Sequence, residues 1–98
     1  MTKQQRWHAR NPWNELARNA KRRCEYPKAR MFSRYGGRGI RYLLSTAEVK
    51  ALWARDAGDR LARPSIDRVN PDGDYEFANV RFIELSENIA ASNRRRMP

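Results

Sequence analysis

Apolar residues recur at helical spacing in the stretch that follows residue 10. Asn11 is suited to cap a helix and Pro12 to occupy its first position, and Pro27 is expected to end it. The residues that share one side of this helix are Trp13, Leu16, Ala17, Ala20 and Cys24. The pattern therefore predicts a helix with one buried side and a basic outward side.

A second helical pattern occupies residues 45–58, "STAEVKALWARDAG". Ser45 and Glu48 have the spacing of a capping box, and Gly58 is a suitable stop. Its apolar stripe, which we expect in the core, consists of Val49, Leu52 and Trp53. Between the two helices, residues 28–38 are expected to begin as a short helix and end in a Gly-Gly turn, and residues 39–44, "GIRYLL", to form a short strand.

The last third of the chain, "SIDRVNPDGDYEFANVRFIELSENIAASNRR", has the pattern of a β-hairpin followed by a helix. Strands are predicted around residues 66–69 and 80–83, and "NPDGD" between them supplies the Pro and Gly of a tight turn. Ser86 is suited to cap the last helix, with Ile89 and Ala90 facing inward.

Together these elements predict a small α+β domain over residues 1–98. It would consist of an N-terminal basic helix, a middle helix and a strand–hairpin–strand–helix unit over residues 65–95. Residues 1–10 are polar and basic, and we expect them to form a flexible arm.

The net charge of +10 is concentrated in the first half of the chain. Residues 1–44 hold twelve Lys or Arg and two Glu, whereas residues 45–98 hold nine cationic and nine acidic residues. A basic face attracts phosphate, and arginine, the commoner cation here, suits bidentate phosphate contacts. We therefore expect DNA as the partner, with a solvated surface or an acidic protein as the alternatives. The residues expected to contact nucleic acid are Arg18, Lys21, Arg22, Arg34, Arg38, Arg41 and Arg68, with Trp7, Trp13 and Tyr35 available to stack on bases.

Cysteine and histidine are too few for two common classes of small domain. Cys24 and His8 are the only residues of their types, so neither a disulfide within the chain nor a Cys/His zinc site can form. No apolar run approaches the ~20 residues of a membrane helix. The start, "MTKQQRWHARNPW", is unlike a signal peptide. We expect a soluble cytoplasmic protein without structural zinc or a membrane partner.

Three side chains in the last third are spaced for one small site. Asp67 on the first strand and Asn88 on the helix offer the oxygen ligands that Mg²⁺ prefers, and Asn79 is placed to bond across the hairpin loop. A one-metal nuclease of this design also needs a general base beside the strand ligand. The residue at that position is Arg68, which cannot accept a proton at physiological pH.

Two blocks, covering roughly residues 20–96, resemble the small phage and intron-associated HNH endonucleases of the ββα-metal family. They are "RRCEYP" followed by "YGGRGI", and the stretch that begins "SIDRVNPDGDY". The resemblance implies that Asp67 and Asn88 hold Mg²⁺ or Mn²⁺ and that Asn79 is the central asparagine. It places Arg68 where many members have the catalytic histidine, and two of the usual cysteines are replaced here, by Leu43 and Val80.

The expected function is thus that of a metal-dependent DNA endonuclease or nickase. We expect it to be slow or inactive because Arg68 replaces the catalytic histidine. The alternatives are a catalytically silent nucleic-acid-binding module and a phage-encoded inhibitor of a host nuclease defence. One site per chain is compatible with a nicking monomer or a cutting homodimer.

Several residues have more than one interpretation. Arg68 is expected to hold phosphate. Alternatively, it could pair with Asp72 or Asp74, or stabilise the charge of the transition state. Asp67 is either a metal ligand, a strand-end residue that caps the hairpin, or a partner of Arg81. Asn88 could equally be an exposed helix residue, and His8 a base supplied by the N-terminal arm.

Overall fold

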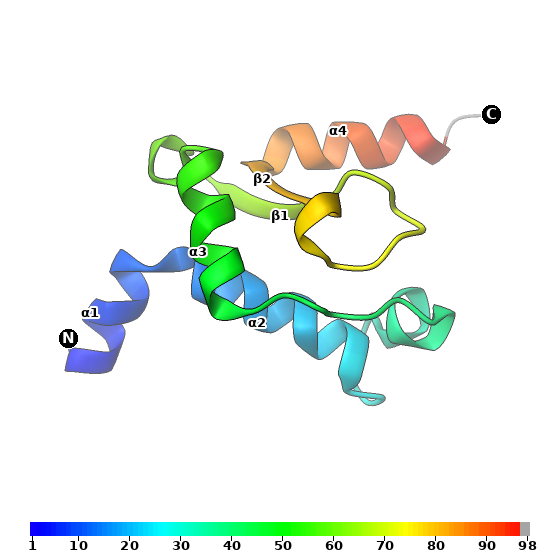
Figure 1. The fold of residues 1–98 in the computed structure, drawn as a ribbon, viewed down its shortest axis with the longest axis horizontal. Coiled ribbons are helices and arrows are strands. Elements are labelled where there is room, and N and C mark those ends of the chain that lie inside the picture. The colour runs from blue at the N-terminus through cyan, green and yellow to red at the C-terminus, as the bar shows by residue number, and fades with distance from the viewer. Residues whose placement is uncertain (97–98) are drawn as a thin grey trace.

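Within residues 1–96, four α-helices and a two-stranded antiparallel sheet make up the fold (Figure 1). The structure is a computed structural model that describes these residues without the side chains of residues 8, 95 and 96. The elements are α1 (Lys3–Arg10), α2 (Pro12–Glu25), α3 (Thr46–Arg55), β1 (Pro64–Arg68), β2 (Val80–Glu84) and α4 (Leu85–Arg96). The predicted α+β class is confirmed. None of the helices described is both long enough and apolar enough to cross a membrane.

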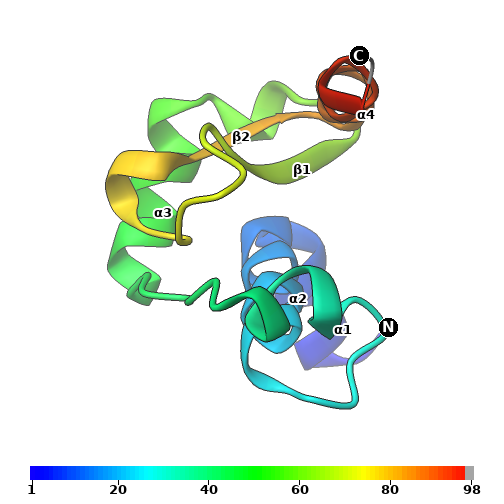
Figure 2. The same ribbon diagram turned by 90° about the vertical axis from the view of Figure 1, so that its right-hand side faces the viewer.

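The sheet lies between α2 and α4. Figures 1 and 2 show α4 along one face of the strands and α2 on the other side, with α3 beside α2 and β2. The strands alternate their side chains between these two sides. The largest residues of the core come from α2, α3, β2 and the hairpin loop, and they are Trp13, Leu52, Trp53, Phe82 and Tyr75.

The first ten residues, which we expected to form a flexible arm, are helical from Lys3 to Arg10. Thr2 and Gln5 close a capping box: the Gln5 amide donates to the Thr2 hydroxyl at 3.1 Å, and the Thr2 amide donates to Gln5 Oε1 at 2.8 Å. Trp7 then packs edge-on against Trp13 of α2, with ring centroids 5.9 Å apart. The Thr-x-x-Gln spacing is the sequence signal for this helix, but the polar and basic composition of the segment led us to expect a flexible arm.

The two helical patterns in the first half of the chain are confirmed by α2 and α3. Pro12 begins α2, and the buried residues of α2 are Trp13, Ala17, Ala20 and Cys24. Asn11 occupies the cap position, but its side chain makes no capping bond and donates instead to the Trp7 carbonyl at 2.7 Å. In α3, the Ser45 hydroxyl accepts from the Glu48 amide and the Glu48 carboxylate accepts from the Ser45 amide, as the capping box predicted. Val49, Leu52 and Trp53 are buried.

The end of α3 differs from the prediction. The helix ends at Arg55, and the residue with a left-handed backbone is Ala57, at a φ of 52°, rather than Gly58. Gly58 instead lies against the Trp53 ring, where a Cβ atom would come within 2.2 Å of the ring carbons. The glycine is thus used for close packing, which the sequence pattern does not reveal.

Residues 39–44 do not form the predicted strand. Tyr42 makes an isolated parallel bridge with Tyr75, through a bond from the Leu43 amide to the Tyr75 carbonyl and one from the Tyr75 amide to the Arg41 carbonyl, both at 2.9 Å. The extended segment meets the hairpin loop at this one residue, so no ladder can continue. Residues 28–38 contain two single 3₁₀ turns, Phe32–Arg34 and Gly36–Arg38.

The strand–hairpin–strand–helix order of residues 65–95 is present, with changed boundaries. β1 and β2 pair so that Asp67 lies opposite Arg81. β2 continues directly into α4, which begins at Leu85, so Ser86 lies inside the helix and is not its cap. Ile89, expected to face inward, is 52% exposed, and the α4 residues that face the cleft along β1 are Leu85, Asn88 and Ser92.

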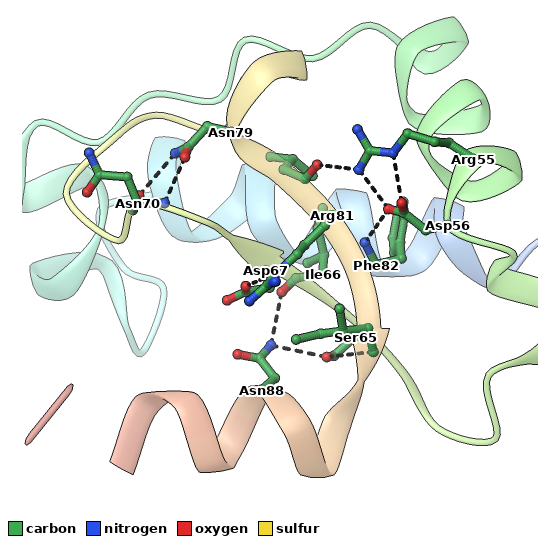
Figure 3. Close-up of polar contacts among 12 residues, drawn as sticks. Arg55, Asp56, Ser65, Ile66, Asp67, Asn70, Asn79, Arg81, Phe82 and Asn88 are labelled. Atoms are coloured by element: carbon green, nitrogen blue, oxygen red, sulfur yellow. Dashed lines mark hydrogen bonds and ion pairs between the residues drawn. The ribbon is translucent and has the colours of Figure 1, made fainter. Parts of the chain in front are cut away.

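Asp56 joins α3 to β2 (Figure 3). Its carboxylate accepts hydrogen bonds from the Arg55 guanidinium at 2.7 and 2.9 Å and from the Phe82 amide at 2.8 Å. Burial by itself would raise the pKa of Asp56, but the hydrogen bonds from Arg55 and Phe82 outweigh it and hold the pKa below its ordinary value. This carboxylate therefore stabilises the fold in its charged form.

Gly36 lies where the turn after Phe32 passes close to the end of α2. A Cβ atom at Gly36 would come within 2.1 Å of the Cys24 carbonyl oxygen, whereas at Gly37 the nearest atom would be 3.2 Å away. The glycine thus allows the two backbones to pack together and positions Tyr35 beside α2.

We predict that Gly36→Ala lowers the free energy of unfolding by about 3 kcal/mol, because backbone atoms rather than a flexible side chain must move. Urea denaturation followed by tryptophan fluorescence measures the change. Gly37→Ala is the control and is expected to cost less than ~1 kcal/mol. Equal losses in the two variants would contradict the close contact at Gly36.

We predict that Asp56→Asn lowers the free energy of unfolding at pH 7 by about 2 kcal/mol, because the charge-assisted bonds to Arg55 and Phe82 weaken. The folded-state pKa of Asp56 is below the unfolded one, so its stabilisation is present above about pH 4 and is lost as the pH falls through the folded value. The difference between wild type and variant should therefore shrink toward pH 3 in denaturation curves. Asp72→Asn, at an exposed ion pair, is the control and is expected to change little at either pH.

Candidate functional site

A cleft of about 400 Å³ lies between α2 and α4, along β1. It brings together three of the predicted site residues, Asp67, Arg68 and Asn88. Asn79 does not line it. The other polar residues that line the cleft are Asn19, Arg23, Tyr35, Ser65, Tyr75 and Ser92.

Asp67 forms part of the cleft wall on β1 and is only 5% exposed. Because the antiparallel register sets Arg81 opposite it, the Arg81 Nε donates to Asp67 Oδ2 at 2.8 Å. Arg81 itself is half exposed, so the pair lies at the edge of the cleft. The other carboxylate oxygen of Asp67 accepts no hydrogen bond from the residues that the structure describes.

Asn88 reaches from the second turn of α4 to β1, on the side of the sheet where Asp67 lies (Figure 3). Its side-chain nitrogen donates to the Ser65 hydroxyl at 3.1 Å and to the Ile66 carbonyl at 3.3 Å. These bonds fix the amide and leave its oxygen without a donor among the described residues. The alternative that Asn88 is simply an exposed helix residue does not hold, because the side chain is half buried and bonded to the strand.

Arg68 is buried and holds the hairpin loop. Its Nη1 donates to the carbonyls of Pro71 at 2.5 Å and Gly73 at 3.0 Å. The guanidinium carbon lies 5.0 Å from the ring centroid of Tyr35 and 5.1 Å from that of Tyr75. The residue is 9% exposed, so much of its function is structural, which the sequence pattern did not predict.

The acidic residues considered as partners of Arg68 have other partners. Asp72 pairs with Arg38 at 2.6 Å, and Asp74 pairs with Arg41 at 3.1 Å. The hydrogen bond from the Arg41 backbone amide holds the pKa of Asp74 below its ordinary value. Two of the arginines that we expected to contact nucleic acid thus also fasten the hairpin loop to the segment after α2.

Asn79 bonds across the hairpin loop. Its side-chain oxygen accepts from the Asn70 amide at 2.8 Å, and its side-chain nitrogen donates to the carbonyls of Asn70 at 3.0 Å and Asp74 at 2.9 Å (Figure 3 shows the Asn70 pair). Three hydrogen bonds from one amide fix both ends of the loop. The arrangement orders the loop and brings no part of Asn79 into the cleft.

Arg23 is a cleft residue that the sequence reasoning missed. It follows Lys21 and Arg22 and was not predicted as a site residue, yet it is half buried, and its Nη2 donates to the Tyr75 hydroxyl at 3.3 Å. Its guanidinium carbon lies 5.0 Å from the Tyr35 ring centroid. The available signal was helical spacing, because position 23 is three residues after Ala20 and shares its inward side.

The other predicted nucleic-acid contacts lie outside the cleft. They are exposed, and they are Arg18, Lys21 and Arg22 on α2 and Arg34, Arg38 and Arg41 in the segment that follows it. Trp13 is only 6% exposed and cannot stack on a base. Trp7 is 45% exposed, and the Tyr35 ring packs on that of Tyr75. These exposed cations therefore do not line the cleft, and Arg18 and Lys21 lie toward the α3 side of α2.

The oxygens of Asp67 and Asn88 are the groups in the cleft that suit a hard cation such as Mg²⁺. No three His, Cys, Asp or Glu side chains gather at one point within the described part of the chain, so most ligands would have to be water or phosphate oxygens. Mg²⁺ commonly keeps several waters, so the donor set fits it. Arg81 already neutralises part of the Asp67 charge, and we therefore expect weak binding. The side chain of His8 lies outside the described residues.

Comparison of the chain with models of protein families, with curated proteins and with solved structures gave no match.

We predict that Asn79→Ala lowers the free energy of unfolding by about 3 kcal/mol, because the loop amide and carbonyls lose their partners at once. The loss should appear in urea denaturation, together with faster amide hydrogen exchange at Asn70. Asn93→Ala, an exposed asparagine of α4, serves as the control. Unchanged exchange at Asn70 in Asn79→Ala would contradict the assigned bonds.

Proposed function

We propose that the protein binds DNA across the cleft between α2 and α4 and hydrolyses a phosphodiester bond with the help of a divalent metal ion, as an HNH-like endonuclease or nickase. The observation that carries the proposal is the meeting of Asp67 and Asn88 with two arginines in one cleft of a chain with a net charge of +10. Oxygen ligands and phosphate-binding cations together are what metal-assisted phosphodiester hydrolysis requires.

In this proposal, Asp67 and Asn88 would hold Mg²⁺ or Mn²⁺ through their unbonded oxygens. The ion, when bound, would polarise the phosphate and stabilise the leaving oxygen. Arg81 orients the Asp67 carboxylate, and the bonds from Asn88 to Ser65 and Ile66 orient the amide. Such fixed orientation is useful because a ligand that is already positioned loses little freedom when an ion binds.

Among the side chains that the structure describes, none beside Asp67 can serve as a general base. Arg68 donates to loop carbonyls, and a guanidinium is a hydrogen-bond donor that offers no acceptor for a proton. No histidine lines the cleft among the residues described. Water would therefore attack without a side chain to accept its proton, and we expect slow turnover.

The burial of Arg68 favours a second candidate function, DNA binding without hydrolysis. In this case the ββα unit would serve as a scaffold, with Arg68 used for stability and the exposed basic residues of α2 and of the segment after it retained for phosphate contacts. Both candidates predict salt-sensitive DNA binding, so only cleavage separates them.

We predict slow nicking of supercoiled plasmid in the presence of Mg²⁺ or Mn²⁺, abolished by EDTA and reduced at least tenfold in Asp67→Asn. Gel electrophoresis over several hours measures the conversion to open circles. Glu76→Gln, which removes a charge from the exposed part of the hairpin, is the control and should retain the wild-type rate.

Folding of Asp67→Asn is checked by circular dichroism, because the variant also weakens the pair with Arg81. Salt-sensitive DNA binding without nicking by the wild type would overturn hydrolysis and favour the second candidate. Absence of both binding and nicking would overturn both, and would leave the inhibitor alternative to be examined.

A further inference from the structure

Arg23 and Arg68 are cations wholly or partly removed from water, and neither has a carboxylate of the described residues within ion-pair distance; Asp74, whose charge acts on Arg68 from farther away, is paired with Arg41. Of the Lys and Arg side chains that the structure describes, only Arg23, Arg68 and Arg81 are buried or half buried. Arg81 is paired with Asp67, whereas neither of the other two forms an ion pair within the described chain. Withdrawing a charge from water without a counter-ion costs free energy, so a counter-ion from outside would stabilise this part of the protein.

The two guanidinium groups share one aromatic ring. Each guanidinium carbon lies 5.0 Å from the Tyr35 ring centroid, and that ring stacks on Tyr75. The ring faces attract a cation, but they carry no net charge to balance two of them. The cluster of Arg23, Arg68, Tyr35 and Tyr75, called the arginine cluster below, therefore has an excess of positive charge.

Arg23 also has hydrogen-bonding capacity to spare. Its Nη2 makes a long bond of 3.3 Å to the Tyr75 hydroxyl. Its Nε is buried and has no hydrogen-bond partner within the described residues. No other buried side-chain nitrogen or oxygen in the described part of the chain lacks one. Arg68, in contrast, has its Nη1 bound to two carbonyls. An unpaired buried donor is costly, and in a cleft it indicates a place for an acceptor.

We propose that the arginine cluster is an anion site that binds a phosphate group, with Arg23 as its principal ligand and Arg68 as its fixed second charge. The planar guanidinium is suited to phosphate oxygens, and Asn19, Asn88 and Ser92 add polar groups to the walls of the same cleft. The group bound is a backbone phosphate of DNA. The choice of DNA rests on the proposed function, but the anion site itself does not require hydrolysis.

A purely structural role for Arg23 makes a different prediction. As a brace for Tyr75, it would stabilise the protein in the absence of phosphate, and its removal would leave any effect of phosphate unchanged. As an anion ligand, Arg23 would contribute little to the stability of the phosphate-free protein. It would account for most of the rise in melting temperature that phosphate causes. Arg23→Met separates the two, because methionine fills a similar volume without charge or donors.

The test measures the melting temperature in sodium phosphate and in sodium chloride of equal ionic strength. Phosphate is expected to raise the wild-type melting temperature by about 3 °C or more over chloride, and Arg23→Met to lose this increment while melting as the wild type does in chloride. Arg60→Met, at an exposed arginine that does not line the cleft, should keep the increment. Asp67→Asn should keep or enlarge it, because that variant removes a negative charge from the cleft.

A second arm measures binding of a fluorescent DNA duplex in EDTA, where hydrolysis cannot occur. Arg23→Met is expected to weaken binding roughly tenfold and to reduce the slope of log K against log salt by about 0.9. Arg60→Met should change neither quantity. If Arg23→Met does not fold, Arg23→Lys keeps the charge but lacks Nε, and it should show a reduced phosphate increment.

The outcomes distinguish the anion site from the proposed hydrolysis. An equal phosphate response in wild type and Arg23→Met, or none in the wild type, would overturn the anion site, whatever the nicking assay gives. Loss of the phosphate increment with unchanged DNA binding would overturn DNA as the source and assign the site to free phosphate or a nucleotide. Failure of nicking with both arms as expected would overturn hydrolysis alone.

Discussion

The buried guanidinium of Arg68 connects the parts of the protein between which the candidate site lies. It extends from the end of β1, donates to two carbonyls of the hairpin loop and packs on the rings of Tyr35 and Tyr75. The loop, the segment after α2 and the sheet therefore share one charged group at their centre. Because a charge withdrawn from water is stabilised by its hydrogen bonds and ring contacts, these contacts of Arg68 hold the three parts together.

The same arrangement decides what the cleft can do chemically. The position beside Asp67, where resemblance to HNH nucleases would place a histidine base, holds a group that adds positive charge and accepts no proton. Asp67 is paired with Arg81 and forms no ion pair with Arg23 or Arg68. The cleft is therefore better suited to hold an anion than to remove a proton from water, and any hydrolysis would depend on a metal ion.

Much of the fold followed from local pattern. The apolar stripe of α2, the capping box of α3 and the position of β2 were all predicted, since each depends on residues within a few positions of one another. The predictions were wrong where contacts with residues distant in the sequence determine the local structure. Residues 39–44 have the composition of a strand but meet only Tyr75, and Gly58 is required by the ring of Trp53 rather than by the end of the helix.

For the candidate site, the sequence by itself determined which chemical groups are present and their order: an aspartate on a strand, an arginine beside it, an asparagine at the loop and another on the final helix. The excess of positive charge in the first half of the chain was equally fixed. Only the tertiary structure decided how these groups are used. It paired Asp67 with Arg81 through the strand register, buried Arg68 under two tyrosines and turned Arg23 inward from a run of basic residues. The physical reason is that burial and pairing depend on which elements pack together, and this packing brings side chains from α2, β1 and α4 to one cleft.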